Sequence, residues 1–200
     1  MPRLAEDRLP AEPVSPDQRE RYRRILRAAA KHGAAKGLER VQMLDVARDA
    51  GVAIATLYRY FPSKTHLFTA LMRHRVERLV DLVVEPPAAD PAEGIGRLLC
   101  QMGDDMLRTP LLTHAMVQSN NATVAHNPSA AVTYVFLDLM LAAGGFDEPT
   151  EQDLRLLRLV EQAWYGIVMS ALNGHIGPTQ VRADTELVCR LLLRDLDMSR

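Results

Sequence analysis

Apolar residues along this 200-residue chain recur mostly at intervals of three and four, the spacing of one face of an α-helix. The pattern starts near Asp17, which can cap a helix, and stops at Gly33 and Gly37. It predicts eight further helices, at about residues 43–50, 54–60, 64–84, 92–108, 111–121, 129–143, 150–173 and 179–197. No strand-like alternation continues for six residues, so we expect an all-α fold of about nine helices.

Residues 1–16 lack this periodicity and carry four of the twelve prolines, so we expect a flexible tail there. The whole chain is 48% hydrophobic, which suits an ordinary buried core. Its longest apolar stretch, residues 163–172, is about half of what a membrane span needs. The two cysteines, Cys100 and Cys189, favour a reducing compartment over a disulfide scaffold. We therefore expect a soluble cytoplasmic protein with no membrane partner.

The formal net charge of −1 hides a division between the two parts of the chain. Residues 1–80 hold 16 Lys and Arg against 9 Asp and Glu, a net charge of +7. Residues 81–200 hold 8 against 16, a net charge of −8. This asymmetry indicates that the front of the chain meets a polyanion, although a solvated basic face is an alternative that charge alone leaves open.

The segment at residues 41–68 has the pattern of a helix-turn-helix, in which two short helices meet at a tight turn. Ala47 is small where two helices must cross closely, and Gly51 allows a positive φ in the turn. Val52 and Leu57 are apolar positions that would fix the second helix against the core. The second helix of such a motif enters the major groove of DNA.

The second short helix also carries an unusual run of polar aromatic and basic residues, Tyr58-Arg59-Tyr60. The alternative interpretation is that these are two helices of an ordinary bundle, but it does not explain why the run is there. Together with the basic front of the chain, the run favours DNA binding.

Two sequence stretches resemble the signature of the TetR family of bacterial transcriptional regulators. They are VARDAGV at residues 46–52 and TLYRYFPSK at residues 56–64. More narrowly, residues 41–43, 52–67 and 110–116 resemble the KstR-type steroid-catabolism repressors of actinobacteria. The resemblance implies an N-terminal helix-turn-helix domain in a three-helix module at residues 17–63, and an effector-binding and dimerisation domain at residues 64–200.

The resemblance also implies which residues contact double-stranded DNA. Positions that match Ile54, Ala55, Thr56 and Tyr58 lie against bases or the adjoining backbone in the family, and those that match Tyr60 and Lys64 hold phosphates. Lys64 follows Ser63 at a helix N-terminus, where the amides already favour an anion. The predicted DNA-binding residues are Gln42, Ala53, Ile54, Ala55, Thr56, Tyr58, Arg59, Tyr60 and Lys64.

One departure from the family concerns the start of the second helix, where many relatives carry a Ser-Lys pair and this chain has Ala53-Ile54. Apolar groups there can contact thymine methyls but donate no hydrogen bond. Hydrogen-bonded reading of bases would therefore depend on Thr56, Tyr58 and Arg59.

The rear 120 residues can form a dimerisation platform, a ligand pocket or both. Apolar stripes on the last two predicted helices suit a core, and the resemblance favours a homodimer in which these helices pair as a four-helix bundle. The middle helices supply flexible and bulky apolar side chains that suit a large hydrophobic effector, although each alone is more typical of core. The predicted ligand-binding residues are Met102, Met106, Leu112, Met116, Val135, Leu139, Trp164, Tyr165 and Met169.

In KstR-type relatives the effector is a coenzyme A thioester of a steroid breakdown product. The acidic rear of this chain offers few cations for a coenzyme, so a bulky hydrophobic effector, derived from a steroid or a fatty acid, is the simpler expectation. A repressor of the multidrug-efflux type, a DNA-binding helical dimer without effector and a helical lipid carrier stay open as alternatives.

The sequence contains no motif that is typical of a catalytic site. The six histidines are scattered, and no HExxH, CxxC, GxSxG or phosphate-binding loop is present. We therefore expect no enzyme, no cofactor and no metal site.

Overall fold

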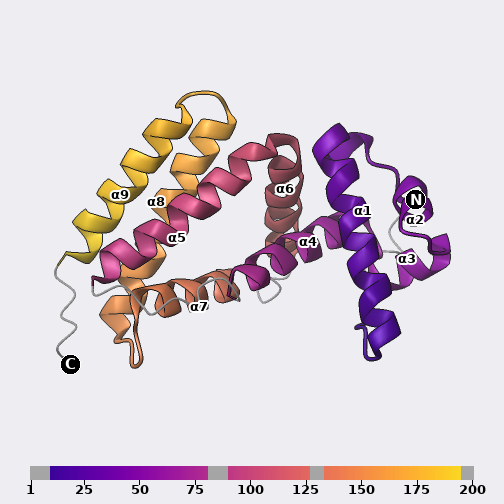
Figure 1. The fold of residues 1–200 in the computed structure, drawn as a ribbon, viewed down its shortest axis with the longest axis horizontal. Helices are drawn as coiled ribbons and strands as arrows, with labels where there is room; N and C mark the ends of the chain where they lie inside the picture. Colours follow the sequence, from indigo (N-terminus) through magenta and orange to yellow (C-terminus); the bar gives the residue numbers. More distant parts are fainter. Residues whose placement is uncertain (1–9, 81–89, 127–132, 195–200) are drawn as a thin grey trace. The chain divides into compact units, whose positions relative to one another are not determined.

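The structure is a computed structural model that describes residues 10–80, 90–126 and 133–194. Within these ranges every regular element is a helix, which confirms the all-α prediction (Figure 1). The helices are α1 (Pro16–Arg40), α2 (Met43–Asp49), α3 (Ile54–Tyr60), α4 (Lys64–Val80), α5 (Pro91–Arg108), α6 (Pro110–His126), α7 (Thr133–Gly144), α8 (Glu151–Leu172) and α9 (Pro178–Leu193).

The first helix begins at a different cap from the predicted one and has a kink at Gly37, where its end was predicted. Ser15, rather than Asp17, is its N-cap, and the Ser15 side chain accepts a hydrogen bond from the backbone N–H of Gln18. Pro16 fits the first turn because its missing N–H would have no intrahelical partner there. At the other end the chain continues past Gly37, which adopts φ 69°, to Arg40. Gly37 therefore breaks the helical geometry at a kink, and a short helical stretch follows it to Arg40.

The chain forms two compact units whose limits differ from the predicted boundary at residue 64. The first unit comprises Met1–Arg75 with Pro110–Val132, and the second comprises Val76–Thr109 with Thr133–Arg200. Helix α6 joins the first unit because it packs against α1. The functional division at residue 64 stays a prediction.

The absence of a side chain at Gly33 of α1 allows side chains of α4 and α6 to pack directly against the backbone of α1. A Cβ atom at Gly33 would lie 2.6 Å from Cε1 of Phe68 and 2.7 Å from Cδ1 of Leu112. These distances are far below van der Waals contact, so only glycine allows α1 to approach α4 and α6 this closely. Leu112 and Met116, two of the predicted effector contacts, are buried in this core.

The helix-turn-helix confirms the predicted turn. Gly51 has φ 64°, and Ala47 and Leu57 are fully buried. The backbone N–H of Val52 donates to the carbonyl of Ala47 at 3.0 Å, which closes the turn. Val52 itself is half-buried and packs against the same core. The angle between α2 and α3 is thus fixed by side chains that do not face solvent.

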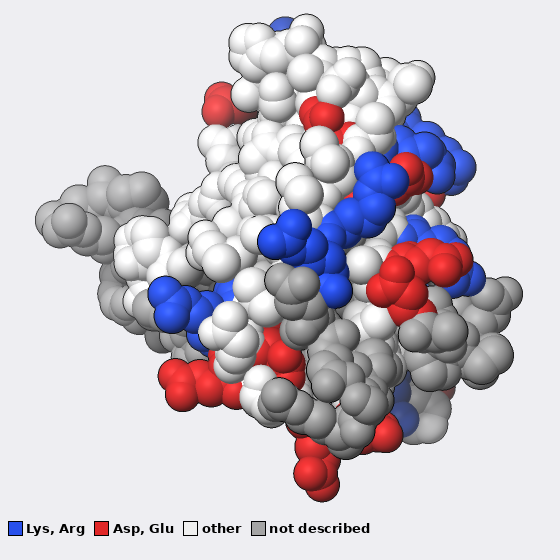
Figure 2. Space-filling model, turned by 90° about the vertical axis from the view of Figure 1, so that its left-hand side faces the viewer, with Lys and Arg blue, Asp and Glu red and all other residues white. Residues whose placement is uncertain are grey.

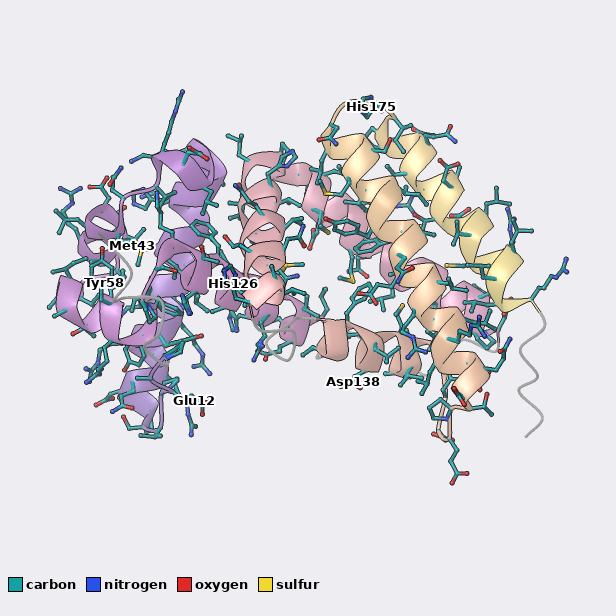
Figure 3. All side chains as sticks on the ribbon, turned by 180° about the vertical axis from the view of Figure 1, so that it is seen from behind. Glu12, Met43, Tyr58, His126, Asp138 and His175 are labelled. Atoms are coloured by element: carbon teal, nitrogen blue, oxygen red, sulfur yellow. The ribbon has the colours of Figure 1, made fainter. Side chains whose placement is uncertain are left out.

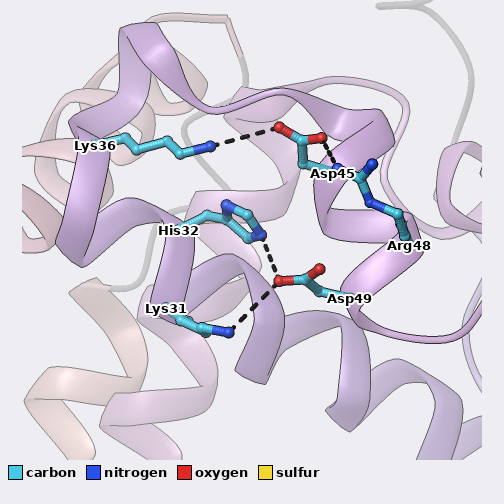
Figure 4. Close-up of polar contacts among 6 residues, drawn as sticks. All are labelled: Lys31, His32, Lys36, Asp45, Arg48 and Asp49. Atoms are coloured by element: carbon cyan, nitrogen blue, oxygen red, sulfur yellow. Dashed lines mark hydrogen bonds and ion pairs between the residues drawn. The ribbon is translucent and has the colours of Figure 1, made fainter.

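Basic side chains of α1 face the two carboxylates of α2 (Figure 4). Asp49 Oδ2 lies 2.9 Å from His32 Nε2 and 3.7 Å from Lys31 Nζ. Lys36 Nζ lies 3.5 Å from Asp45 Oδ2, one turn earlier on α2. The hydrogen bond with His32, and then the charge of Lys31, hold the pKa of Asp49 below its ordinary value. These pairs tie α2 to α1 at the surface.

In the second unit, α5 packs against α7, α8 and α9. Trp164 of α8 donates from Nε1 to the carbonyl of Leu99 on α5 at 3.1 Å, and its ring stacks on Phe136 of α7 with centroids 5.3 Å apart. Thr150 and Asp153 form a capping box at the start of α8. One indole therefore connects three helices of this unit.

Basic and acidic side chains are interspersed on the face of the molecule shown in Figure 2, so that face is not uniformly acidic.

Among the residues that the structure describes, no helix is long and apolar enough to cross a bilayer. In the same ranges, no group of three or more His, Cys, Asp or Glu could hold a metal ion.

A pH dependence of stability follows from Glu161 on α8, whose pKa is raised from 4.5 to about 7 by burial. The unfolded chain ionises this carboxyl near its ordinary pKa, whereas the folded chain resists ionisation. The protonated carboxyl therefore contributes to the free energy of unfolding. This contribution is fully present below about pH 4.5 and is lost as the pH rises through about 7. We expect Glu161→Gln to be more stable than the wild type at pH 8, with a smaller difference at pH 5.

Urea denaturation of both proteins at the two pH values measures this difference. The exposed Glu148→Gln is the control and should shift both midpoints by the same small amount. Equal effects of Glu161→Gln at pH 5 and pH 8 would contradict the argument.

Candidate nucleic-acid interface

Helix α3 buries one side and leaves the other open. Leu57 and Tyr60 are buried, while the remaining five residues of this seven-residue helix are exposed or half-exposed. Tyr58 projects from α3 and is 45% exposed (Figure 3). At 100° per residue the open positions occupy one continuous arc. They are Ile54, Ala55, Thr56, Tyr58 and Arg59, with the exposed Ala53 at the N-cap.

Two further predicted DNA-binding residues, Gln42 and Lys64, flank this arc in the chain. Gln42 is exposed at the N-cap of α2, and its side chain makes no capping hydrogen bond. Lys64 is half-buried at the start of α4, and its Nζ donates to the carbonyls of Leu38 at 3.3 Å and Glu39 at 3.1 Å. Because an ammonium has three N–H donors, these bonds occupy only part of its capacity. Lys64 thus satisfies two backbone carbonyls in the last turn of α1.

Tyr60, for which the resemblance implies a phosphate contact, lies in the core, and that contact stays a prediction. It is 1% exposed, and its hydroxyl accepts a hydrogen bond from Arg59 Nη2 at 3.3 Å. Tyr60 follows Leu57 by three residues, which places both on the same face of α3. That spacing is the sequence signal that identifies Tyr60 as a buried residue.

A contact that the sequence did not predict joins the N-terminal segment to α3. The backbone N–H of Ala11 donates to the carbonyl of Arg59 at 3.1 Å, and Ala11 is half-buried against the core of the first unit. Of the predicted flexible tail, residues 1–9 lie outside the described ranges. In the described part, Ala11 satisfies a carbonyl at the end of α3, and Val14 and Ser15 form hydrogen bonds with the start of α1.

The predicted effector contacts fall into two sets. Leu112 and Met116 belong to the core of the first unit, whereas the other seven lie in the second unit. Within the second unit Met102, Leu139 and Trp164 are buried and Tyr165 is exposed; Met106, Val135 and Met169 are half-buried.

The last two helices leave large apolar side chains in solvent. Leu159 and Tyr165 of α8 are exposed, as are Leu187 and Leu191 of α9. The same helices bury an opposite face, which includes Val168 and Cys189. Helices with two apolar faces have more apolar surface than their own unit covers.

Two family descriptions match the chain. "Bacterial regulatory proteins, tetR family" matches residues 25–71, which include the helix-turn-helix. "Tetracyclin repressor-like, C-terminal domain" matches residues 89–192.

The chain is also similar to named relatives over most of its length. It is 37% identical to the transcriptional repressor KstR of Rhodococcus jostii over 89% of this chain and 85% of that protein. It is 36% identical to KstR of Mycobacterium tuberculosis over 97% and 88%. The crystal structure of a TetR transcriptional regulator from Rhodococcus sp. RHA1 shares 43% identity, with a TM-score of 0.82, and covers 92% of this chain and 100% of that one.

These matches agree with the helix-turn-helix geometry and with the predicted absence of an enzyme, because members of this family are DNA-binding transcription factors. The chain belongs to the TetR family of bacterial transcriptional regulators and is a repressor of the KstR-like kind.

Proposed function

We propose that this repressor binds a palindrome-like operator in the cytoplasm by placing α3 in the major groove. The observation that carries the proposal is the open arc of α3, which holds Thr56, Tyr58 and Arg59 on a helix whose opposite face is buried. A two-fold dimer would set two such helices about 34–36 Å apart, one turn of DNA.

Roles on DNA follow from the chemistry of each position. Thr56, Tyr58 and Arg59 can donate hydrogen bonds to base edges, and Ala53, Ile54 and Ala55 can contact thymine methyls. Gln42 and the remaining donor capacity of Lys64 can reach phosphates. We do not assign a phosphate to Tyr60, because its ring is buried.

The contact by Arg59 has a direct test. Selection of chromosomal fragments on the purified protein identifies the operator, and fluorescence anisotropy then measures affinity for that operator and for unrelated DNA. We expect Arg59→Ala to weaken operator binding by roughly 5- to 150-fold, the effect of one lost base contact, with a much smaller effect on unrelated DNA.

Arg97→Ala, which removes an exposed arginine from α5, outside the proposed DNA and dimer contacts, is the matched control and should leave both affinities unchanged. Equal losses on operator and unrelated DNA would instead make Arg59 a phosphate contact.

We also propose a homodimer through α8 and α9. The exposed Leu159, Leu187 and Leu191 support it, because such side chains are typical of surfaces that a second copy covers. Pairing of two helices from each copy would form a four-helix bundle.

Substitution of one exposed leucine tests this interface. We expect Leu187→Glu to convert the dimer to a monomer in sedimentation experiments, because a carboxylate would have to be buried between two copies. The control is Leu111→Glu on α6, since Leu111 has nearly the same exposure, 48% against 45%. Identical sedimentation of the two variants would place the interface elsewhere.

For the effector we propose a bulky hydrophobic molecule, with a steroid- or fatty-acid-derived coenzyme A thioester as the candidate class. The support is the similarity to KstR and the apolar side chains of α5, α7 and α8, among them Met102, Phe136 and Trp164. Helix α4 has residues in both compact units and is the element through which effector binding would reach the DNA-binding helices. A coupling of about 5- to 150-fold in operator affinity would be ordinary.

Operator release tests the effector class. The protein on labelled operator is titrated with a steroid-acid thioester of coenzyme A, a long-chain acyl-coenzyme A, the free acids and coenzyme A alone. We expect release, with a rise in melting temperature, for one of the thioesters and none for coenzyme A alone. Release only by unrelated hydrophobic drugs would favour a repressor of the efflux type, and no release by any compound would favour a DNA-binding dimer without effector.

A further inference from the structure

Three aromatic rings converge behind the recognition helix. Tyr22 of α1 meets Tyr60 edge-on, with ring centroids 5.8 Å apart at 89°, and lies 4.9 Å from the ring of Phe61. Tyr60 and Phe61 are themselves 6.3 Å apart. Because Tyr60 is clamped in this cluster, its hydroxyl is held at a fixed point at the edge of the core.

That hydroxyl meets the guanidinium of Arg59. Arg59 Nη2 donates to Tyr60 Oη at 3.3 Å, and Arg59 Cζ lies 5.1 Å from the centroid of the Tyr60 ring. The same arginine is fixed at its backbone, because its carbonyl accepts the N–H of Ala11. Arg59 is exposed, yet it is restrained at its head group and at its main chain.

A guanidinium carries five N–H donors, and the bond to Tyr60 uses one of them. The others stay available to a base edge or a phosphate. An arginine that is already oriented loses less conformational freedom when it binds than one that moves freely in solvent. The geometry therefore gives the buried tyrosine a role that does not require it to touch DNA.

We propose that Tyr60 is a positioning residue for Arg59: the tyrosine hydroxyl, held by the ring cluster, aims the guanidinium at the operator. This inference rests on the proposed contact between Arg59 and DNA. It replaces the phosphate contact expected for Tyr60 with an indirect effect on how the neighbouring arginine reads the operator.

A double-mutant cycle separates the direct role from the indirect one. Operator affinity is measured at several salt concentrations for the wild-type dimer, Tyr60→Phe, Arg59→Ala and the double variant. Tyr60→Phe keeps the ring against Tyr22 and Phe61 and removes only the hydroxyl. Tyr22→Phe, which removes a hydroxyl from the same cluster, is the control for a general effect of the cluster, and the melting temperature of every variant is recorded.

We expect Tyr60→Phe to weaken operator binding by about 2- to 12-fold, the effect of leaving one long side chain to be ordered on binding. It should leave the dependence on salt unchanged. In the Arg59→Ala background the same substitution should have no effect, because the residue that it positions is absent.

Three outcomes would overturn the inference, each in a distinguishable way. A loss of the same size in the Arg59→Ala background, with a salt slope lowered by about one, would make Tyr60 a direct phosphate contact. Unchanged affinity in Tyr60→Phe beside a clear loss in Arg59→Ala would leave Arg59 as a contact that needs no positioning. Unchanged affinity in Arg59→Ala would remove the proposed contact itself.

Discussion

A helix of seven residues does not keep its shape in water by its own hydrogen bonds, so α3 depends on the face that it buries. Leu57 and Tyr60 supply that face, and the left-handed Gly51 sets the direction in which it enters the core. The side chains offered to DNA can therefore vary without loss of the helix, provided that these inner positions stay apolar or aromatic. Of the pair Ala53-Ile54, which departs from the common Ser-Lys pair, Ala53 is exposed, whereas Ile54 is half-buried against the core.

The charge pairs between α1 and α2 have a second consequence for binding a polyanion. Asp45 and Asp49 lie on the first helix of the motif, where uncompensated carboxylates would repel phosphates. Lys31 and Lys36 of α1 compensate their charge, and Arg48 of α2 pairs with Asp45. Such exposed pairs add little to stability, so their main effect is on the field that the motif presents.

Local pattern predicted most of the helices, because a spacing of three and four and the positions of glycine and proline are local properties. It also predicted the turn at Gly51 and the burial of Leu57. The local pattern could not predict which residues far apart in the chain pack together. Nothing near Leu112 in the sequence shows that it lies against Gly33, or that Leu112 and Met116 belong to the core of the first unit.

For Tyr60 the local pattern and the family resemblance pointed to different surroundings. Its spacing of three from Leu57 indicates burial, while the resemblance implied a phosphate contact. The N-cap at Ser15 was missed for a simpler reason, since Asp17 and Ser15 are both good caps and only the position of Pro16 distinguishes them.

The hydrogen bond from Ala11 to Arg59 makes the segment before the first helix a structural support of α3. Insertions or deletions between Pro10 and Ser15 change no residue of the motif, yet they would shift the donor that completes the end of α3. Among homologues, the length of this short connection should thus vary less than its composition, because a backbone N–H is available from any residue except proline. The choice of operator would then depend partly on the number of residues between Pro10 and Ser15, which lie outside the helix-turn-helix motif.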